Sequence, residues 1–256
     1  MICAELIDLF NDIADPSLSS DWDNPGLIVG DENMAVKRIL VALDATDEVI
    51  DEAVELKVDL ILTHHPLIFK GIKKVNGSDF TGRRILRLIK NDISCFAMHT
   101  DFDIACMGGE ASDRIGLKNS RILQAVSENE GFGRIGDLPK SMSVSELCDL
   151  VKERFYIEYV KVFGDLDTVV STAAVMPGSG ASAIDDAIEN GADVLITGDI
   201  DHHEGIDSVE KNLIIIDAGH FGLEKIFIDY MKDYIERNTE GLEVYTDIKE
   251  RGFTII

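Results

Sequence analysis

The six histidines of the sequence all lie in four short motifs, and each motif follows an apolar, strand-like stretch. Ligands of open α/β sheets gather at the carboxyl ends of strands, so these side chains are expected to converge. Imidazoles combined with carboxylates suit Zn, Fe, Mn, Co or Ni better than Ca or Mg. The pattern therefore predicts a transition-metal site drawn from His64, His65, His99, His202, His203 and His220.

Two acidic residues stand at a fixed distance from histidines. Asp103 follows His99 by four positions, and Glu224 follows His220 by four. In a helix this spacing places both side chains on one face. A carboxylate can bridge two cations and a neutral imidazole cannot, so the pairs allow a centre of two ions. Asp101 is a competing ligand in the first pair.

The adjacent histidines stand at the end of the apolar run in the stretch DLILTHHPLIF, residues 59–69. Successive side chains of an extended strand point to opposite faces. At a strand end that turns through Pro66, however, both rings can reach around a two-ion centre. We therefore expect His64 and His65 to belong to the same site.

The elements behind these motifs alternate between helix-like and strand-like patterns. Near-continuous apolar strands separated by helices are typical of buried parallel or mixed sheets, and so of the α/β class. We predict strands at 36–44, 59–63, 93–99, 159–165 and 213–220, and helices at 2–14, 46–57, 80–91, 143–155 and 221–238. Residues 171–199 are predicted to form a strand, a glycine turn, a helix and a further strand.

An internal repeat organises the chain. Residues 50–63 align without gaps to residues 184–197, with six of 14 positions identical. After a gap, the two histidine–carboxylate pairs also align. Two related α/β subdomains with mixed sheets and pseudo-two-fold symmetry are expected, with the metal site in the cleft between them. We place them at 1–118 and 119–256, with one intimately joined domain as the alternative.

Five motifs carry a resemblance to a known family. They are DWDNPGLIVGD (21–31), LTHHPLIF (62–69), HTDFD (99–103), GDIDHH (198–203) and DAGHFGLE (217–224). In order and content they closely resemble the GTP cyclohydrolase I type 2 family, also called the NGG-interacting-factor-three-like proteins. The resemblance covers nearly the whole chain. It implies two α/β subdomains, a dinuclear centre of divalent ions (Zn, Fe or Mn) and assembly as a homohexamer.

The resemblance also implies a ligand set and a reaction. Glu224 would bridge the two ions, with His65 and Asp103 on one and His64 and His220 on the other. The family name implies attack of metal-bound hydroxide on the purine ring of GTP, with ring opening and loss of formate. His203 or His99 would transfer protons. A phosphoesterase is the alternative within the enzymes, and a non-catalytic metal-binding, scaffold or regulatory protein is the alternative outside them.

Two stretches are candidates for binding a small, phosphorylated substrate. Residues 70–90 hold seven of the 24 basic residues against a single acid, which can attract phosphate. The segment PGSGAS, 177–182, stands between a strand and a helix, where backbone amides can hold an anion. The alternatives without a ligand are a solvated helix face and loop for residues 70–90 and an ordinary glycine turn for residues 177–182. The candidate residues are Lys70, Lys73, Lys74, Arg83, Gly178 and Gly180.

Charge and composition exclude several classes of protein. The net charge of −24 argues against non-specific nucleic acid binding and against an anionic membrane surface, because both require a basic face. No apolar stretch approaches the roughly 20 residues of a membrane helix. The start of the sequence lacks the basic region of a signal peptide, and the four cysteines show no disulfide pattern. We expect a cytoplasmic protein without a signal peptide.

Overall fold

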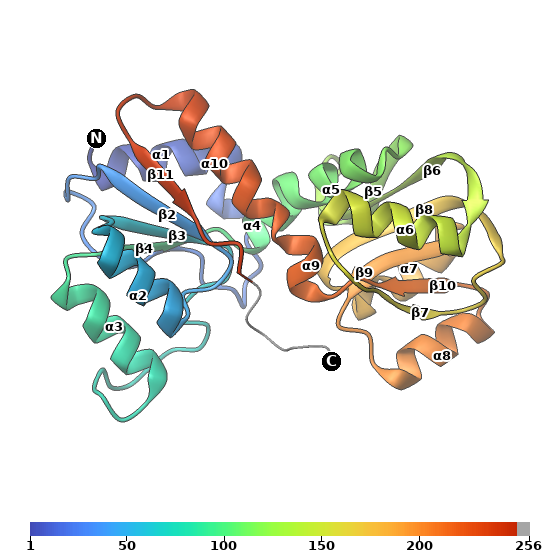
Figure 1. Ribbon diagram of the computed structural model, residues 1–256, viewed down its shortest axis with the longest axis horizontal. Coiled ribbons are helices and arrows are strands. Elements are labelled where there is room, and N and C mark those ends of the chain that lie inside the picture. Colours follow the sequence, from blue (N-terminus) through green and yellow to red (C-terminus); the bar gives the residue numbers. More distant parts are fainter. Residues whose placement is uncertain (250–256) are drawn as a thin grey trace. The chain divides into compact units, whose positions relative to one another are not determined.

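The computed structural model describes residues 1–249 of the 256-residue chain. The chain forms two compact units, drawn in Figure 1. Unit 1 comprises Met1–Phe102 and the segment from Phe227 onward, and unit 2 comprises Asp103–Ile226. Unit 1 includes the C-terminal segment, in which the strand Glu243–Thr246 pairs with Arg38–Val41 of that unit's sheet. The predicted division at 118/119 stays a prediction.

Unit 1 contains a five-stranded mixed sheet in the order β1-β4-β3-β2-β11. The pairs β2–β3, β3–β4 and β2–β11 are parallel, and β1 runs antiparallel to β4. The strands are β1 (Gly26–Val29), β2 (Arg38–Ala42), β3 (Leu60–Thr63), β4 (Ser94–Ala97) and β11 (Glu243–Thr246). The helical segments are α1 (Cys3–Ile13), η1 (Pro16–Leu18), α2 (Asp47–Leu56), α3 (Phe80–Lys90), α4 (Thr100–Phe102) and α10 (Ile226–Asn238).

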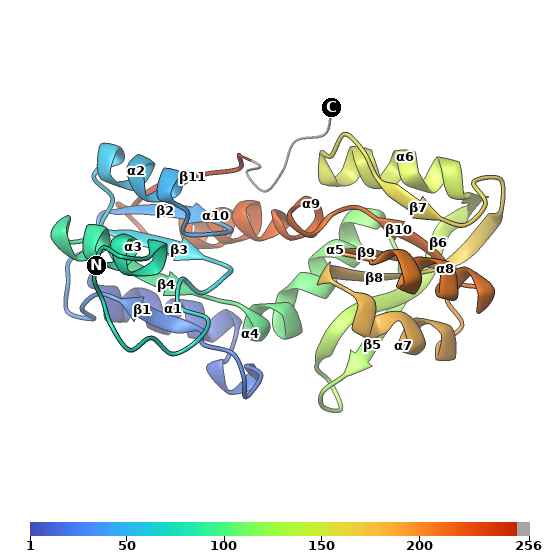
Figure 2. The ribbon, with the colours of Figure 1, turned by 90° about the horizontal axis from the view of Figure 1, so that it is seen from below.

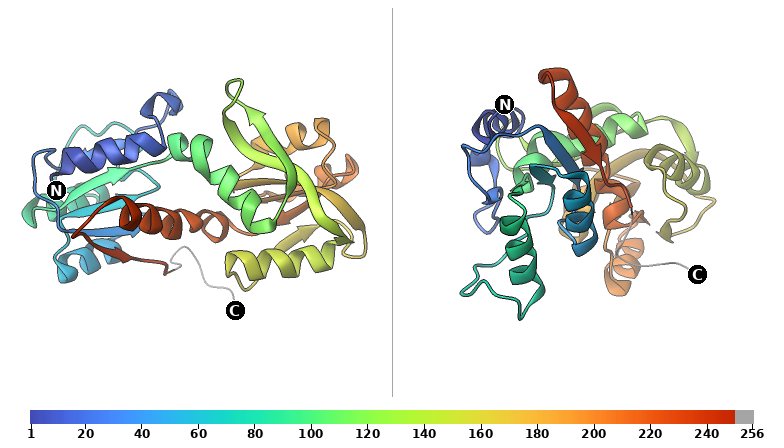
Figure 3. Two further views of the ribbon diagram at one scale, coloured as in Figure 1. Left: turned by 90° about the horizontal axis from the view of Figure 1, so that it is seen from above. Right: turned by 60° about the vertical axis from the view of Figure 1, so that its left-hand side comes forward.

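Helices cover both faces of this sheet. Figure 3 shows α2 and α3 on one face and α1 and α10 on the other. Every residue of β3 and β4 is buried, which explains why these strands read as continuous apolar runs instead of alternating ones. One core lies under α2 and α3, and rings such as Phe10 and Phe96, 5.3 Å apart, fill the other face.

Unit 2 contains a six-stranded mixed sheet in the order β5-β6-β8-β9-β10-β7. The strands are β5 (Lys118–Ala125), β6 (Gly131–Ser143), β7 (Lys161–Phe163), β8 (Val169–Ser179), β9 (Val194–Gly198) and β10 (Ile214–Asp217). The helical segments are η2 (Asp103–Met107, a π-helix), α5 (Gly108–Ile115), α6 (Val144–Phe155), η3 (Ala181–Ala183), α7 (Ile184–Glu189), α8 (His202–Glu210) and α9 (His220–Glu224). Figure 2 shows α6 and α7 on opposite sides of this sheet.

The two units share a core arrangement, which accounts for the sequence repeat. In unit 1 the order β2-α2-β3-α3-β4 builds three parallel strands, and in unit 2 the order β8-α7-β9-α8-β10 does the same. An antiparallel strand flanks the third strand in each case, β1 beside β4 and β7 beside β10. Each unit thus has the mixed α/β architecture expected from the sequence.

Within residues 1–249, the structure has no helix whose length and apolar character would allow it to cross a membrane.

Candidate metal centre

His64 and His65 follow the last residue of β3, as the sequence predicts. The His64 ring is completely buried, and its Nδ1 lies 2.7 Å from the Met98 carbonyl oxygen. A carbonyl can only accept a hydrogen bond, so Nδ1 carries the proton. In the neutral ring the lone pair is then on Nε2. The fold therefore fixes the tautomer that a metal ligand requires.

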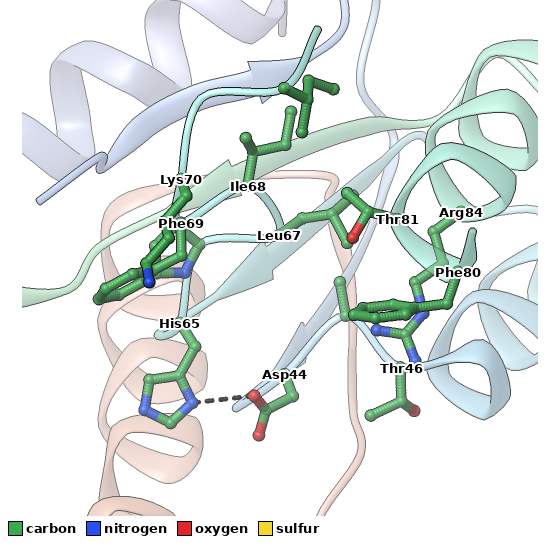
Figure 4. A pocket seen from close by; sticks show the side chains of 13 residues that line it. Asp44, Thr46, His65, Leu67, Ile68, Phe69, Lys70, Phe80, Thr81 and Arg84 are labelled. Atoms are coloured by element: carbon green, nitrogen blue, oxygen red, sulfur yellow. Dashed lines mark hydrogen bonds and ion pairs between the residues drawn. The ribbon is translucent and has the colours of Figure 1, made fainter. Parts of the chain in front are cut away.

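His65 is oriented by a carboxylate instead of a carbonyl. Its Nδ1 lies 2.9 Å from Oδ1 of Asp44, which follows the end of β2 (Figure 4). The backbone amide of His65 donates to the Leu43 carbonyl at 2.9 Å, and the Thr63 hydroxyl donates to the His65 carbonyl at 2.9 Å. These bonds hold the turn after the strand. Paired with Asp44, the ring presents Nε2 for coordination.

His99 lies close to both of these rings. Its ring centroid is 5.2 Å from that of His64 and 5.5 Å from that of His65. One ligand atom from each histidine fits within 4.8 Å of the others, so the three form a grouping that could hold a metal ion. The histidine pair follows β3, and His99 follows β4. These strands are parallel neighbours, so the residues after them lie at the same edge of the sheet.

Asp23 holds His99 in place. Its Oδ1 lies 2.7 Å from the His99 Nδ1, while its Oδ2 accepts from the amide and hydroxyl of Thr100 at 3.0 and 2.6 Å. Burial alone would raise the pKa of Asp23, but the hydrogen bonds from His99 and Thr100 hold that pKa well below its usual range. The carboxylate therefore stays ionised and fixes the ring.

Asp101 and Asp103 fall in different surroundings. Asp101 is buried, and its carboxylate accepts from the Phe102 amide at 2.9 Å. Burial raises the pKa of Asp101 to about 6 despite that hydrogen bond. Asp103 is half-buried and is the first residue of the π-helix, an element often found at functional sites.

Unit 2 brings together His220 and Glu224, one turn apart in α9. The His220 Nδ1 lies 2.8 Å from Oδ2 of Asp199, and its Nε2 lies 2.9 Å from Oε2 of the buried Glu224. With Nδ1 protonated toward Asp199, a neutral Nε2 directs a lone pair at a carboxylate. Two acceptors at this distance share a cation, either a proton or a metal ion. This donor set fits a divalent metal.

Glycines make room for this pair. Gly178 has φ of +79°, and a Cβ at this position would overlap Oε1 of Glu224. A Cβ at Gly198 would collide with the backbone of His220, and one at Gly180 with the Thr197 hydroxyl. The observed role of the predicted anion-binding glycines is thus to admit neighbouring groups of unit 2. Their binding of substrate stays a prediction.

The remaining predicted residues are exposed. His202 and His203 open α8, with ring centroids 5.3 Å apart. Lys70, Lys73, Lys74 and Arg83 are all exposed to solvent. Two other members of the basic stretch are paired with acids of α2: Arg84 Nε donates to Asp47 at 3.1 Å, and Arg87 contacts Asp51.

The sequence reasoning missed the acids that orient the histidines. Asp44 and Asp199 each come at or just after the end of a strand and each binds an Nδ1, and Asp23 does so from the loop before β1. One signal could have indicated Asp44 and Asp199. Each aspartate comes at or just after the end of a buried strand, and a histidine follows the next strand.

Fold and donor groups together define an α/β protein with histidine and glutamate groupings that could bind metal. A sequence model described as Duf34/NIF3 (NGG1p interacting factor 3) matches residues 1–250, and the chain belongs to this family. A protein named GTP cyclohydrolase 1 type 2 homolog from Clostridium acetobutylicum is 38% identical over 250 residues, covering 95% of this chain and 93% of the relative. A namesake from Streptococcus pneumoniae is 33% identical and covers 90% and 88%.

Solved structures agree with this assignment. Staphylococcus aureus protein SA1388 has a TM-score of 0.89 at 26% identity, covering 100% of this chain and 99% of that one. Reduced HcgD from Methanocaldococcus jannaschii has a TM-score of 0.85 at 29% identity, covering 96% and 97%. The family expected from motifs such as LTHHPLIF and DAGHFGLE is confirmed, as is the mixed α/β fold.

Proposed function

We propose that this protein is a metal-dependent hydrolase of a nucleotide or related phosphorylated compound, with a dinuclear centre formed by His64, His65, Asp103, His220 and Glu224. The observation that carries the proposal is the tautomer set by each ligand histidine's partner. Hydrogen bonds at Nδ1 of His64, His65 and His220 leave the lone pair of each neutral ring on Nε2.

In the proposed reaction, residues of this chain hold the metal ions and transfer protons. When bound, two divalent ions lower the pKa of a coordinated water and stabilise developing negative charge. Asp44 and Asp199 hold the ligand rings and raise their basicity. Glu224 is buried, with its Oε1 beside Gly178, and would supply a carboxylate ligand to the ions. His99, fixed by Asp23, and the exposed His203 are the proposed proton-transfer groups.

GTP turnover with product analysis tests this function. Formate release supports ring opening of the purine, as the relatives' name GTP cyclohydrolase 1 type 2 homolog suggests. Inorganic phosphate without formate would support a phosphoesterase. Metal binding without turnover of any nucleotide in a broad panel would contradict the hydrolase and support the non-catalytic alternative.

The proton-transfer role has its own matched control. His203→Ala should slow turnover about 100-fold or more, whereas substitution of its neighbour in α8, His202→Ala, should not, although both residues are exposed. Equal rates for the two variants would remove His203 from the mechanism.

The proposed assembly is a homohexamer, on the family resemblance. Light scattering of the purified protein should give about six times the mass of one chain. A monomer at working concentration would contradict it.

A further inference from the structure

A pocket in unit 1 opens beside His65. It encloses about 420 Å³ between the turn that follows β3, the start of α2 and the first turn of α3. Asp44 and His65 form one edge, as Figure 4 shows. A ligand in this pocket therefore lies next to a proposed metal ligand.

The walls of the pocket are mainly apolar. Leu67 and Ile68 line it, and the rings of Phe69 and Phe80 stand on opposite sides of it in Figure 4. These two rings are 47% and 57% exposed. Exposed aromatic faces that flank an apolar pocket suit a flat ring, because stacking buries both surfaces.

Two cations accompany the rings. The Arg84 guanidinium lies 5.0 Å from the centre of the Phe80 ring, and its Nε donates to Asp47 at 3.1 Å, so it is fixed in position. Lys70 also lines the pocket, and it forms no ion pair within the part of the chain that the structure describes, residues 1–249. In a protein with a net charge of −24, an uncompensated lysine at an aromatic pocket favours an anionic ligand.

We propose that this pocket binds the flat heteroaromatic ring of the substrate, with an anionic group of the substrate on Lys70. The proposal rests on the proposed function and names the substrate class for the same site: a purine nucleotide held by its base. Ring stacking against Phe80 and Phe69 orients the base, and the edge of the pocket at His65 receives the reacting part of the molecule.

The sequence provides an optical reporter. Trp22 is the single tryptophan, and its ring centroid lies 5.6 Å from that of Phe69. A base stacked against Phe69 changes the surroundings of this indole. Binding is therefore expected to alter Trp22 fluorescence without any need for turnover.

The test is a titration of the purified protein with GMP, followed by Trp22 fluorescence and by calorimetry. Phe80→Ala should weaken GMP binding about tenfold or more, because it removes a stacking face. Ile89→Ala is the matched control, since Ile89 lies on the same helix, is 56% exposed and does not line this pocket. Equal GMP affinity in Phe80→Ala and wild type, or no GMP binding to wild type at millimolar concentration, would overturn the proposal.

A second pair of ligands tests the anion contact. Lys70→Ala should weaken binding of GMP and leave binding of guanosine unchanged, because guanosine lacks the phosphate. An equal loss for both ligands would contradict the assignment of Lys70 to the anionic group. Metal content is measured on the same samples, so that the two proposals can be tested separately. Loss of GMP binding in a variant that retains its metal is an effect on the pocket. Absence of metal from the wild-type protein contradicts the proposed function instead.

Discussion

Among single residues, the carboxylates that bind the Nδ1 atoms of the histidines are expected to have a large effect on metal affinity. Asp199 binds Nδ1 of His220 at 2.8 Å and so fixes both the tautomer and the ring orientation. Removing such a partner from a metal-ligating histidine lowers metal affinity by about 10- to 100-fold. Asp199→Ala should show this loss in a competition titration with a chelator.

Asp199→Asn serves as the control for that prediction. Its amide oxygen can still accept from Nδ1, so it should recover part of the lost affinity. Equal metal affinity in wild type and Asp199→Ala would show that the carboxylate has no part in the site.

Gly178 provides a second test at this scale. Gly178→Ala places a methyl group where Oε1 of Glu224 lies, so it should displace that carboxylate and lower metal content. Gly191→Ala is the matched control, because Gly191 has the same φ of +79° in the same unit, but a Cβ added there would meet nothing within 4 Å. Both variants carry backbone strain of about 1–3 kcal/mol, yet only Gly178→Ala should lose metal. Loss in both would assign the effect to strain.

Part of the candidate site was predictable from residue types and spacing. The position of His64 and His65 at a strand end and the i, i+4 pairing of His220 with Glu224 both follow from local periodicity. The partners on Nδ1 did not follow, because Asp44, Asp199 and the Met98 carbonyl come from neighbouring strands. Pairing between strands depends on sheet order, which a single sequence does not reveal.

At the scale of elements, local signals set the helix boundaries. Ser143 caps α6 in a capping box: its hydroxyl accepts from the Glu146 amide at 3.2 Å, and the Glu146 carboxylate accepts from the Ser143 amide at 2.8 Å. Ser143→Ala should lower the free energy of unfolding by about 1 kcal/mol in urea denaturation. Ser145→Ala, exposed inside the same helix, should leave it nearly unchanged. Equal losses would argue against the cap.

Elements with strong periodicity were predictable, and elements that depend on distant pairing were not. The helices α1, α2, α3 and α6 and the central strands β2, β3, β4, β9 and β10 lie where the sequence places them. The strand β5 was missed because much of it is exposed. The strand β6 was missed because it contains three glycines and a proline, which are depleted in strands. The strand β11 was not predicted because it forms by pairing with β2, which is distant in the sequence.

At the scale of the whole molecule, the net charge of −24 opposes compaction. Salt shortens the Debye length from about 30 Å at 0.01 M to about 8 Å at 0.15 M, so it screens this repulsion. The free energy of unfolding should therefore rise between these two salt concentrations when urea denaturation is measured at constant metal content. A fall with added salt would show that favourable surface ion pairs outweigh the net repulsion.

The proposed dinuclear centre depends on Glu224 as a carboxylate ligand. Elemental analysis of protein purified without added metal or an affinity tag tests it, with Glu224→Ala, the isosteric Glu224→Gln and the exposed-residue control Glu210→Ala prepared in the same way. About two ions per chain in wild type and Glu210→Ala, falling sharply in both Glu224 variants, is the predicted result. Wild-type protein with almost no metal and no uptake of Zn, Mn or Fe on titration would contradict the centre, and the proposed hydrolase with it.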